Sequence, residues 1–535
     1  MFLPSAFCLL PSAFCLLPSA FCLLLDPKMR LRSGSVGAGS LPSAFFLPIL
    51  TAHLIPRGYI ENHMNVIGLD LGTTGCKAVL VGEDGQPVRS TYRSYPLIKT
   101  EPGEATQNAD VLWKAVQEAL KDLNAEHADG LAFSGAMHSL LPIGNNGQSL
   151  CNALTWADTR PLETLKEVPL DPNAVYLKTG APLQTPYHPA KITYLQHKHP
   201  ELFSQVHLLV SLKDHIAFQL TGQWKADIGL ASSSGLLNLH TGQWDADILH
   251  SLQVQSLLPE VLDAHDLLGH ITPEATTLTG LKAGMPVFAG SSDGGLANLG
   301  TGAGVQDTVI TVGTSGAVRS MGKGPQLDAR GRTWCYFLSR AQVFSGGAIN
   351  NAGLLIDWVK RMHYPTETFE VLFKEAAEVS SSEGLLFLPY LTGERSPHWK
   401  SDLSATVHGL TLQHTRAHLA KAALEAVCFS LAEVYDLVSE GTTRTLVTGS
   451  ITRSPLWMQM LSDTLNRELV VAHTVDASSL GAAMVALVAL DNSKSRLTYK
   501  VQYALGFVPQ PDAATHMTGI REDWKGLFTS IWKEL

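Results

Sequence analysis

Hydrophobic and polar positions alternate along the chain in short runs that predict a mixed α/β fold. An apolar run at residues 66–71 ends in a Gly-Thr-Thr-Gly turn at 72–75, and a second apolar run follows at 77–81. This order predicts a strand, a tight glycine turn and a second strand. Apolar residues at helical spacing then predict a helix over 108–123, and a further buried strand is expected at 130–134.

The same opening recurs in the second half of the chain. Residues 307–319 read as a strand, a Gly-Thr-Ser-Gly turn and another strand, and helical spacing follows at 348–362 and 416–438. The repetition predicts a duplicated α/β architecture with ligands in the cleft between the halves, because ligand sites are common at domain interfaces. We place the domains at 64–305 and 306–535, with the boundary near the end of a glycine-rich linker.

The first 63 residues differ from the rest of the chain because they contain a seven-residue repeat. Residues 3–9, 10–16 and 17–23 each read Leu-Pro-Ser-Ala-Phe-Cys-Leu. Proline at every seventh position interrupts a helix, and no basic residue precedes the apolar run. Both facts argue against a membrane span and a signal peptide, and a targeting segment stays the less favoured alternative. We interpret residues 1–63 as a low-complexity, disordered extension translated from repetitive DNA, and Met64 as the true start.

Composition and charge exclude several classes of function. The formal charge of −9 argues against broad nucleic-acid binding, which needs clustered basic residues. Outside the repeats, Cys76, Cys151, Cys335 and Cys428 lie far apart without zinc-ligand spacing, as suits a reducing cytoplasm. We therefore expect a cytoplasmic enzyme with neither nucleic acid nor membrane as a partner.

The first glycine turn has the chemistry of a phosphate loop. Gly72 lets the backbone turn sharply and expose N–H groups, while Thr73 and Thr74 add hydroxyl donors. Lys77 supplies a positive charge for a phosphate. Asp70, at the end of the preceding strand, is suited to hold Mg²⁺ through water. A plain hairpin turn is the alternative, and the second loop at residues 313–316 makes it less favoured.

These motifs occur in an order that resembles the FGGY carbohydrate kinase family, which includes glycerol kinase, xylulokinase and one class of gluconokinase. The resemblance covers residues 64–510. Its motifs lie at residues 70–77, 290–295, 313–314, 346–350, 388–395 and 447–455. It implies two actin-like (RNase H-like) ATPase domains with an inter-domain cleft, and a reaction that uses ATP and Mg²⁺.

The resemblance also assigns roles to individual residues. It makes Asp293 the catalytic base, whereas the residues alone would favour an Asx-turn aspartate. With an ordinary carboxyl pKa of about 4, such a base would accept the proton late in the transfer. Together with the two loops, the resemblance places around ATP the residues Gly72, Thr73, Thr74, Lys77, Gly313, Thr314, Gly346, Asn350, Gly449, Ser450 and Ser454.

Within the family, the segments at 134–139 and 155–160 look most like those of gluconokinases. This likeness implies phosphorylation of a sugar acid, D-gluconate to 6-phospho-D-gluconate. An anionic substrate requires a cationic or donor-rich partner. We expect His138 and Arg160 to supply it, with Met137 as an apolar wall beside Asp293. Arg160→Ala is expected to raise KM for gluconate more than for a neutral polyol.

Two other functions stay open at this stage. One is a kinase for xylulose or another neutral polyol, and the other is a non-catalytic actin-fold regulator that only binds ATP. Ser404 and Ser450 stand where the family usually has arginine and glycine, which keeps open, besides these two, a catalytically inactive regulatory homologue of the family. Oligomeric state is also open, with a homodimer as one arrangement. Residues 300–304 are expected to lie near a hinge that closes the cleft.

Overall fold

The computed structural model describes residues 64–474, 476–491, 501–504 and 506–532. The extension at 1–63, which we expect to be disordered, lies outside the described residues. No helix in the part that is described is long and apolar enough to cross a membrane.

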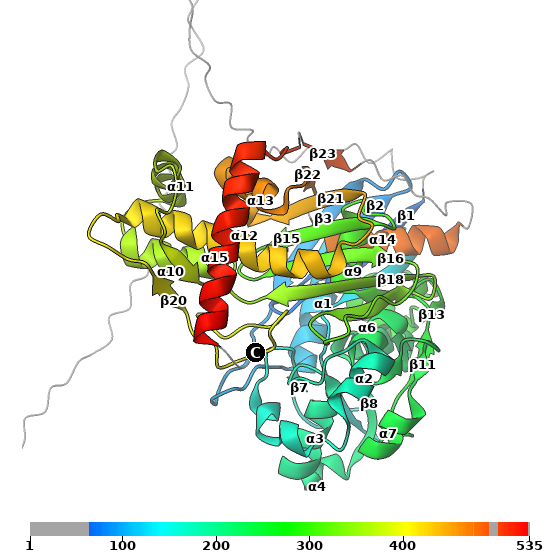
Figure 1. The fold of residues 1–535 in the computed structure, drawn as a ribbon. Coiled ribbons are helices and arrows are strands. Elements are labelled where there is room, and N and C mark those ends of the chain that lie inside the picture. Colours follow the sequence, from blue (N-terminus) through cyan, green and yellow to red (C-terminus); the bar gives the residue numbers. More distant parts are fainter. Residues whose placement is uncertain (1–63, 475, 492–500, 505, 533–535) are drawn as a thin grey trace, which may run out of the picture. The chain divides into compact units, whose positions relative to one another are not determined.

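The first half of the chain builds a mixed sheet (Figure 1). Among the described residues it has six strands, in the order β13-β14-β5-β1-β2-β3. Their bounds are β1 (Asn65–Leu71), β2 (Gly75–Gly82), β3 (Pro87–Ser94), β5 (Gly130–Gly135), β13 (Leu267–His270) and β14 (Pro286–Ser292). Strand β1 is antiparallel to β2 and parallel to β5, which is parallel to β14. The strands expected at 66–71, 77–81 and 130–134 are confirmed.

The second half repeats this arrangement. Its described strands follow the order β17-β18-β16-β15-β21-β22-β23. Their bounds are β15 (Asp307–Val312), β16 (Gly316–Gly322), β17 (Trp334–Ser339), β18 (Gln342–Ile349), β21 (Arg444–Gly449), β22 (Leu469–His473) and β23 (Gln502–Tyr503). Strand β15 is antiparallel to β16 and parallel to β21, as β1 is to β2 and β5. The duplicated α/β architecture is therefore confirmed.

Helices pack on both sheets. Helix α1 (Ala109–Leu123) is capped by Asn108, whose side chain accepts from the first free N–H groups, and it packs on β2 and β3. Helix α12 (Arg416–Val438) packs on β16 and β18 and has the predicted bounds. Helix α10 (Gly353–His363) begins later than predicted. Ala348 still pairs with Ala317 in the sheet, so β18 takes the first predicted residues of that helix.

The remaining elements complete each half. The other helices are α2 (Pro172–Thr179), α3 (His188–Lys198), α4 (Pro200–Phe203), α5 (Leu212–Thr221), α6 (Ile228–Ser233), α7 (Ala246–Leu252), α8 (Pro273–Thr279), α11 (Phe369–Glu378), α13 (Pro455–Leu465), α15 (Pro511–Ile531) and the 3₁₀ helices η2 (Arg160–Glu167) and η3 (Ser450–Arg453). Short strand pairs are β4 (Thr106–Gln107) with β7 (Ala153–Leu154), β6 (Leu141–Gly144) with β8 (Val206–Val210), β9 (Lys225–Asp227) with β12 (Glu260–Leu262), β10 (Leu237–Asn238) with β11 (Gln243–Trp244), and β19 (Leu386–Leu388) with β20 (Thr406–His408).

Two helices pack closely where the halves meet. Helix α9 (Asp293–Gly300) directly follows β14, and α14 (Ala477–Leu490) packs against both α9 and β1. A Cβ on Gly481 would overlap the carbonyl of Leu296 on α9. The small residues at 481–483 therefore allow close helix packing. Because α9 is anchored in this way, its first residue, Asp293, has a fixed position.

Candidate active site

A cavity of about 260 Å³ lies between the two halves of the chain. From the first half it is lined by Thr73, Met137, His138, Trp156 and Asp293. From the second half it is lined by Ser315, Gly316, Arg319 and Arg395. Residues that are more than 200 positions apart in the sequence thus face one small space, and both glycine turns contribute to it.

Asp293 is the one carboxylate among the described residues that line this cavity. The residues alone favoured an Asx-turn aspartate, but Asp293 is the first residue of α9, and its carboxylate accepts from the N–H of Gly294 at 2.7 Å. Burial raises the pKa of Asp293 to about 6, the charge of Asp70 adds to the rise, and Arg319 opposes it. Asp293 is therefore a stronger base than a carboxylate of ordinary pKa.

This raised pKa gives an expected pH dependence. Only the ionised carboxylate accepts a proton, so kcat/KM for the acceptor should be level above pH 7 and fall tenfold per pH unit well below about 6. Repeating the profile with an ATP analogue whose terminal phosphate titrates at a lower pH separates the two ionisations. A profile that stays level down to pH 5, or an inflection that moves with the analogue, would contradict the assignment to Asp293.

The two glycine turns border the same cavity as Asp293. In the first, the N–H of Gly72 donates to the carbonyl of Gly75 at 3.0 Å, which closes the turn between β1 and β2. In the second, the N–H of Gly313 donates to the carbonyl of Ser315 at 2.8 Å. The side chains of Thr74 and Thr314 are exposed. Each half therefore offers one turn with open donors at the edge of the cavity, as a phosphate chain would require.

The predicted nucleotide residues of β18 and α13 have structural roles. Gly346 is buried within β18, where a Cβ would lie 2.5 Å from the carbonyl of Val318. Ser454 is buried and caps α13 by accepting from the N–H of Trp457 at 3.3 Å. The structure accounts for both residues by packing and capping, and neither lines the cavity. Their contact with ATP stays a prediction.

The end of β21 and the side chain of Asn350 have more specific surroundings. Gly449 has φ of +93°, and a Cβ there would overlap the carbonyl of Val312. The next residue, Ser450, donates to that same carbonyl at 3.1 Å. Asn350 accepts from Nε of Arg395 at 2.6 Å. Asn350 therefore orients a cavity-lining arginine, and a nucleotide contact for Gly449, Ser450 and Asn350 stays a prediction.

Asp70 and Lys77 lie on neighbouring strands behind the first turn. Lys77 forms an ion pair with Asp476. Asp70 accepts from Ser134 at 2.5 Å, and burial raises its pKa. No group of three or more His, Cys, Asp or Glu side chains in the described ranges could hold a metal. Asp70 with Asp293 nearby still suits Mg²⁺, because this ion is usually held by one or two carboxylates, water and substrate phosphates.

His138 adopts the left-handed backbone conformation, with φ of +68°. Its Nδ1 lies 2.8 Å from the carbonyl of Ser233, so this nitrogen carries the proton and donates. Burial, followed by the charge of Lys191, lowers the pKa of His138 to about 3. The imidazole is therefore neutral, and Nε2 can only accept. This geometry suits a substrate hydroxyl better than the carboxylate that we expected His138 to bind.

Arg160, which we expected to bind the carboxylate of gluconate, does not line the cavity, so the selective effect expected of Arg160→Ala loses its structural basis. Its guanidinium donates to both oxygens of Asp158, at 3.0 and 2.6 Å, and to Glu101 at 2.6 Å. The arginines that do line it, Arg319 and Arg395, were missed. Arg319 could have been found from the sequence, because it alternates with Ala317 along a strand that begins at the second glycine turn, and alternate residues share one face.

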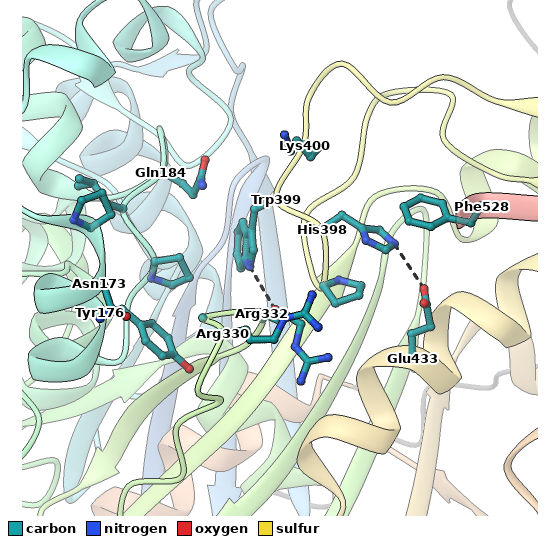
Figure 2. Close-up of a pocket in the computed structure, with 15 residues that line it drawn as sticks. Asn173, Tyr176, Gln184, Arg330, Arg332, His398, Trp399, Lys400, Glu433 and Phe528 are labelled. Atoms are coloured by element: carbon teal, nitrogen blue, oxygen red, sulfur yellow. Dashed lines mark hydrogen bonds and ion pairs between the residues drawn. The ribbon is translucent and has the colours of Figure 1, made fainter. Parts of the chain in front are cut away.

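The loop that carries Arg395 is rigidly held. Glu394 and Lys400 exchange backbone hydrogen bonds at 2.7 and 2.9 Å, and Trp399 donates from its indole to the carbonyl of Arg332 at 3.1 Å. Figure 2 shows a second cavity, of about 570 Å³, which is lined in part by His398, Trp399 and Lys400 of this loop. Trp399 lines both cavities, so this loop forms the wall between them. Arg395 is therefore positioned before any ligand arrives.

Taken together, a duplicated α/β fold, two glycine turns and a buried carboxylate between them define a phosphotransferase class of site. Comparison with known proteins makes this class specific. Residues 65–300 match the N-terminal domain of the FGGY family of carbohydrate kinases, and residues 308–490 match its C-terminal domain. The chain belongs to the FGGY family of carbohydrate kinases.

Its relatives include kinases with different acceptors. The chain is 33% identical to the gluconokinase of Bacillus subtilis (strain 168) over 85% of its length and 90% of that protein. It is 30% identical to the xylulose kinase of the same organism, over 79% of this chain and 87% of that protein. The crystal structure of gluconate kinase from Lactobacillus acidophilus superposes with a TM-score of 0.84 at 28% identity, over 88% of this chain and 99% of that chain. The actin-like fold is thereby confirmed, and similarity alone does not choose between the acceptors.

Proposed function

We propose that this carbohydrate kinase transfers the γ-phosphoryl group of ATP to D-gluconate and forms 6-phospho-D-gluconate. The observation that carries the proposal is the charge of the cavity. Arg319 and Arg395 both line it, against the single carboxylate of Asp293. Two guanidinium groups in one cavity can serve both the terminal phosphate of ATP and an anionic acceptor, which favours a sugar acid over a neutral polyol.

The positions of these groups support the following transfer. The 6-hydroxyl of gluconate lies against Asp293, which accepts its proton as the new O–P bond forms. The bond between the γ-phosphorus and the bridging oxygen breaks, and ADP leaves with that electron pair. Mg²⁺, held by Asp70 through water, would neutralise charge on the phosphates. The exposed hydroxyls of Thr74 and Thr314 in the two glycine turns donate to the phosphate chain, and His138 accepts from a hydroxyl of the sugar acid.

A panel of acceptors tests the proposal. ADP release is measured with D-gluconate, D-xylulose, glycerol and no acceptor at equal enzyme and ATP. We expect kcat/KM for gluconate to exceed that for each neutral acceptor by about 10- to 100-fold, the range for a charge-assisted hydrogen bond. A neutral acceptor that is used best would support the xylulokinase alternative. ADP release that is the same without any acceptor would support the ATP-binding regulator.

A further inference from the structure

The two arginines of the cavity lie in different surroundings. Arg319 is close to the base, because a Cβ on Gly294, the residue after Asp293, would lie 3.2 Å from Nε of Arg319. Arg395 lies over Trp156, with its guanidinium carbon 5.5 Å from the ring centroid. One guanidinium is thus beside the reacting carboxylate, and the other is at the wall formed by the rigid loop 394–400.

Arg319 has donors that the protein does not use. Its Nε is buried and has no hydrogen-bond partner among the described residues, and one terminal nitrogen lies 3.4 Å from Oγ1 of Thr311. A buried donor without a partner is costly unless a ligand satisfies it. The cavity wall next to Arg319 includes Ser315 and Gly316 of the second glycine turn. A ligand group that satisfies Arg319 would lie in the part of the cavity lined by the second glycine turn and Asp293.

Arg395 is oriented by the protein and still open to a ligand. Its Nε donates to Asn350 at 2.6 Å, and one terminal nitrogen lies 3.4 Å from the carbonyl of Ile349. A guanidinium has five N–H donors, so further donors remain for the cavity that Arg395 lines. Such a planar fork, fixed from behind, is suited to bind a carboxylate through two parallel hydrogen bonds.

The chemistry of the acceptor decides which anion meets which arginine. In gluconate the 6-hydroxyl and the carboxylate are at opposite ends of a six-carbon chain. When that hydroxyl lies at Asp293, the carboxylate of an extended chain lies away from Asp293 and from Arg319 beside it. Trp156, over which Arg395 lies, donates its indole N–H to Oγ1 of Thr73 in the first glycine turn at 3.0 Å.

We propose that the two arginines bind two different anions. Arg395 binds the carboxylate of the sugar acid, and Arg319 binds the γ-phosphoryl group. The inference rests on the proposed function and adds a specificity-determining residue to it. It also separates the effect of a substitution on acceptor selection from its effect on the transfer step, which a single cationic site would combine. Loss of Arg395 acts on acceptor selection, and loss of Arg319 acts on the transfer step.

The test compares gluconate with D-glucitol, which has the same chain with a hydroxymethyl group in place of the carboxylate. Dissociation constants are measured by calorimetry without nucleotide, and kcat is measured with ATP. Arg395→Met should weaken gluconate binding by about 10- to 100-fold and D-glucitol binding far less. Arg319→Met should lower kcat by about 10²- to 10³-fold, as the loss of a transition-state donor does, without a selective loss of gluconate affinity.

Two control variants make the outcome specific. Arg160→Ala removes an arginine outside the cavity and should keep the preference for gluconate. Arg395→Lys keeps the charge but loses the fork, should lose part of the preference, and serves if Arg395→Met does not fold by circular dichroism. A selective loss of gluconate in Arg319→Met or Arg160→Ala, or equal losses of both ligands in Arg395→Met, overturns the inference while the proposed function stands. A wild-type protein that binds both ligands equally and does not phosphorylate gluconate overturns both.

Discussion

Asp293→Asn is expected to lower kcat by about 10²- to 10⁴-fold, the contribution that a positioned general base usually makes. The amide has nearly the shape of the carboxylate and can still accept from the N–H of Gly294, which now lies 2.7 Å from Oδ1. Helix α9 should therefore keep its first turn. The acceptor hydroxyl would keep a neighbour but would lose the group that takes its proton.

The measurements are kcat, KM and the melting temperature of Asp293→Asn and wild type. We expect KM for the acceptor to change much less than kcat, because the transfer step is affected more than ground-state binding. The neutral amide also removes the carboxylate whose pKa is raised to about 6, so any residual activity should lose the fall below that pH. Activity within threefold of wild type would exclude Asp293 as the base and contradict the mechanism.

The order of strands, turns and helices could be predicted from the local pattern of hydrophobic and polar residues. The turns at 72–75 and 313–316 were predicted because glycine and threonine between two apolar runs leave few other backbone paths. Helix α12 was predicted with its observed bounds because its apolar spacing is continuous. The start of α10 was placed too early, since Ala348 and its neighbours are compatible with either element and the pairing with β16 decides between them.

The chemistry of the site was less accessible to sequence reasoning. Asp293 could be selected by family resemblance, but its raised pKa depends on burial and on Asp70, which lies on β1, far from Asp293 in the sequence. Arg160 and Arg395 are indistinguishable as sequence letters. Only the fold shows that Arg160 forms ion pairs with Asp158 and Glu101, while Arg395 lines the cavity. Local sequence patterns do not show which residues pair when they are far apart in the chain.

Lys213→Met is expected to lower the free energy of unfolding by about 3–5 kcal/mol, the usual cost of removing one partner from a buried ion pair. Lys213 has 1% of its side chain exposed and lies 3.0 Å from Asp227 and 3.2 Å from Asp214. It also lies 3.3 Å from the carbonyl of Ala289 on β14, the strand that leads to Asp293. Without Lys213, the buried carboxylates of Asp214 and Asp227 would lose their counter-charge next to β14.

Two comparisons separate charge pairing from simple packing, with unfolding in urea followed by circular dichroism. Lys225→Met removes a lysine from β9, the strand of Asp227, where the partner Glu260 is 65% exposed, and should cost less than about 1 kcal/mol. The double variant Lys213→Met with Asp227→Asn should recover part of the loss, because the amide keeps the cap on Leu230 and needs no counter-charge. A double variant less stable than Lys213→Met would mean that Lys213 acts through its packing, and that the pair does not hold β14 in place by charge.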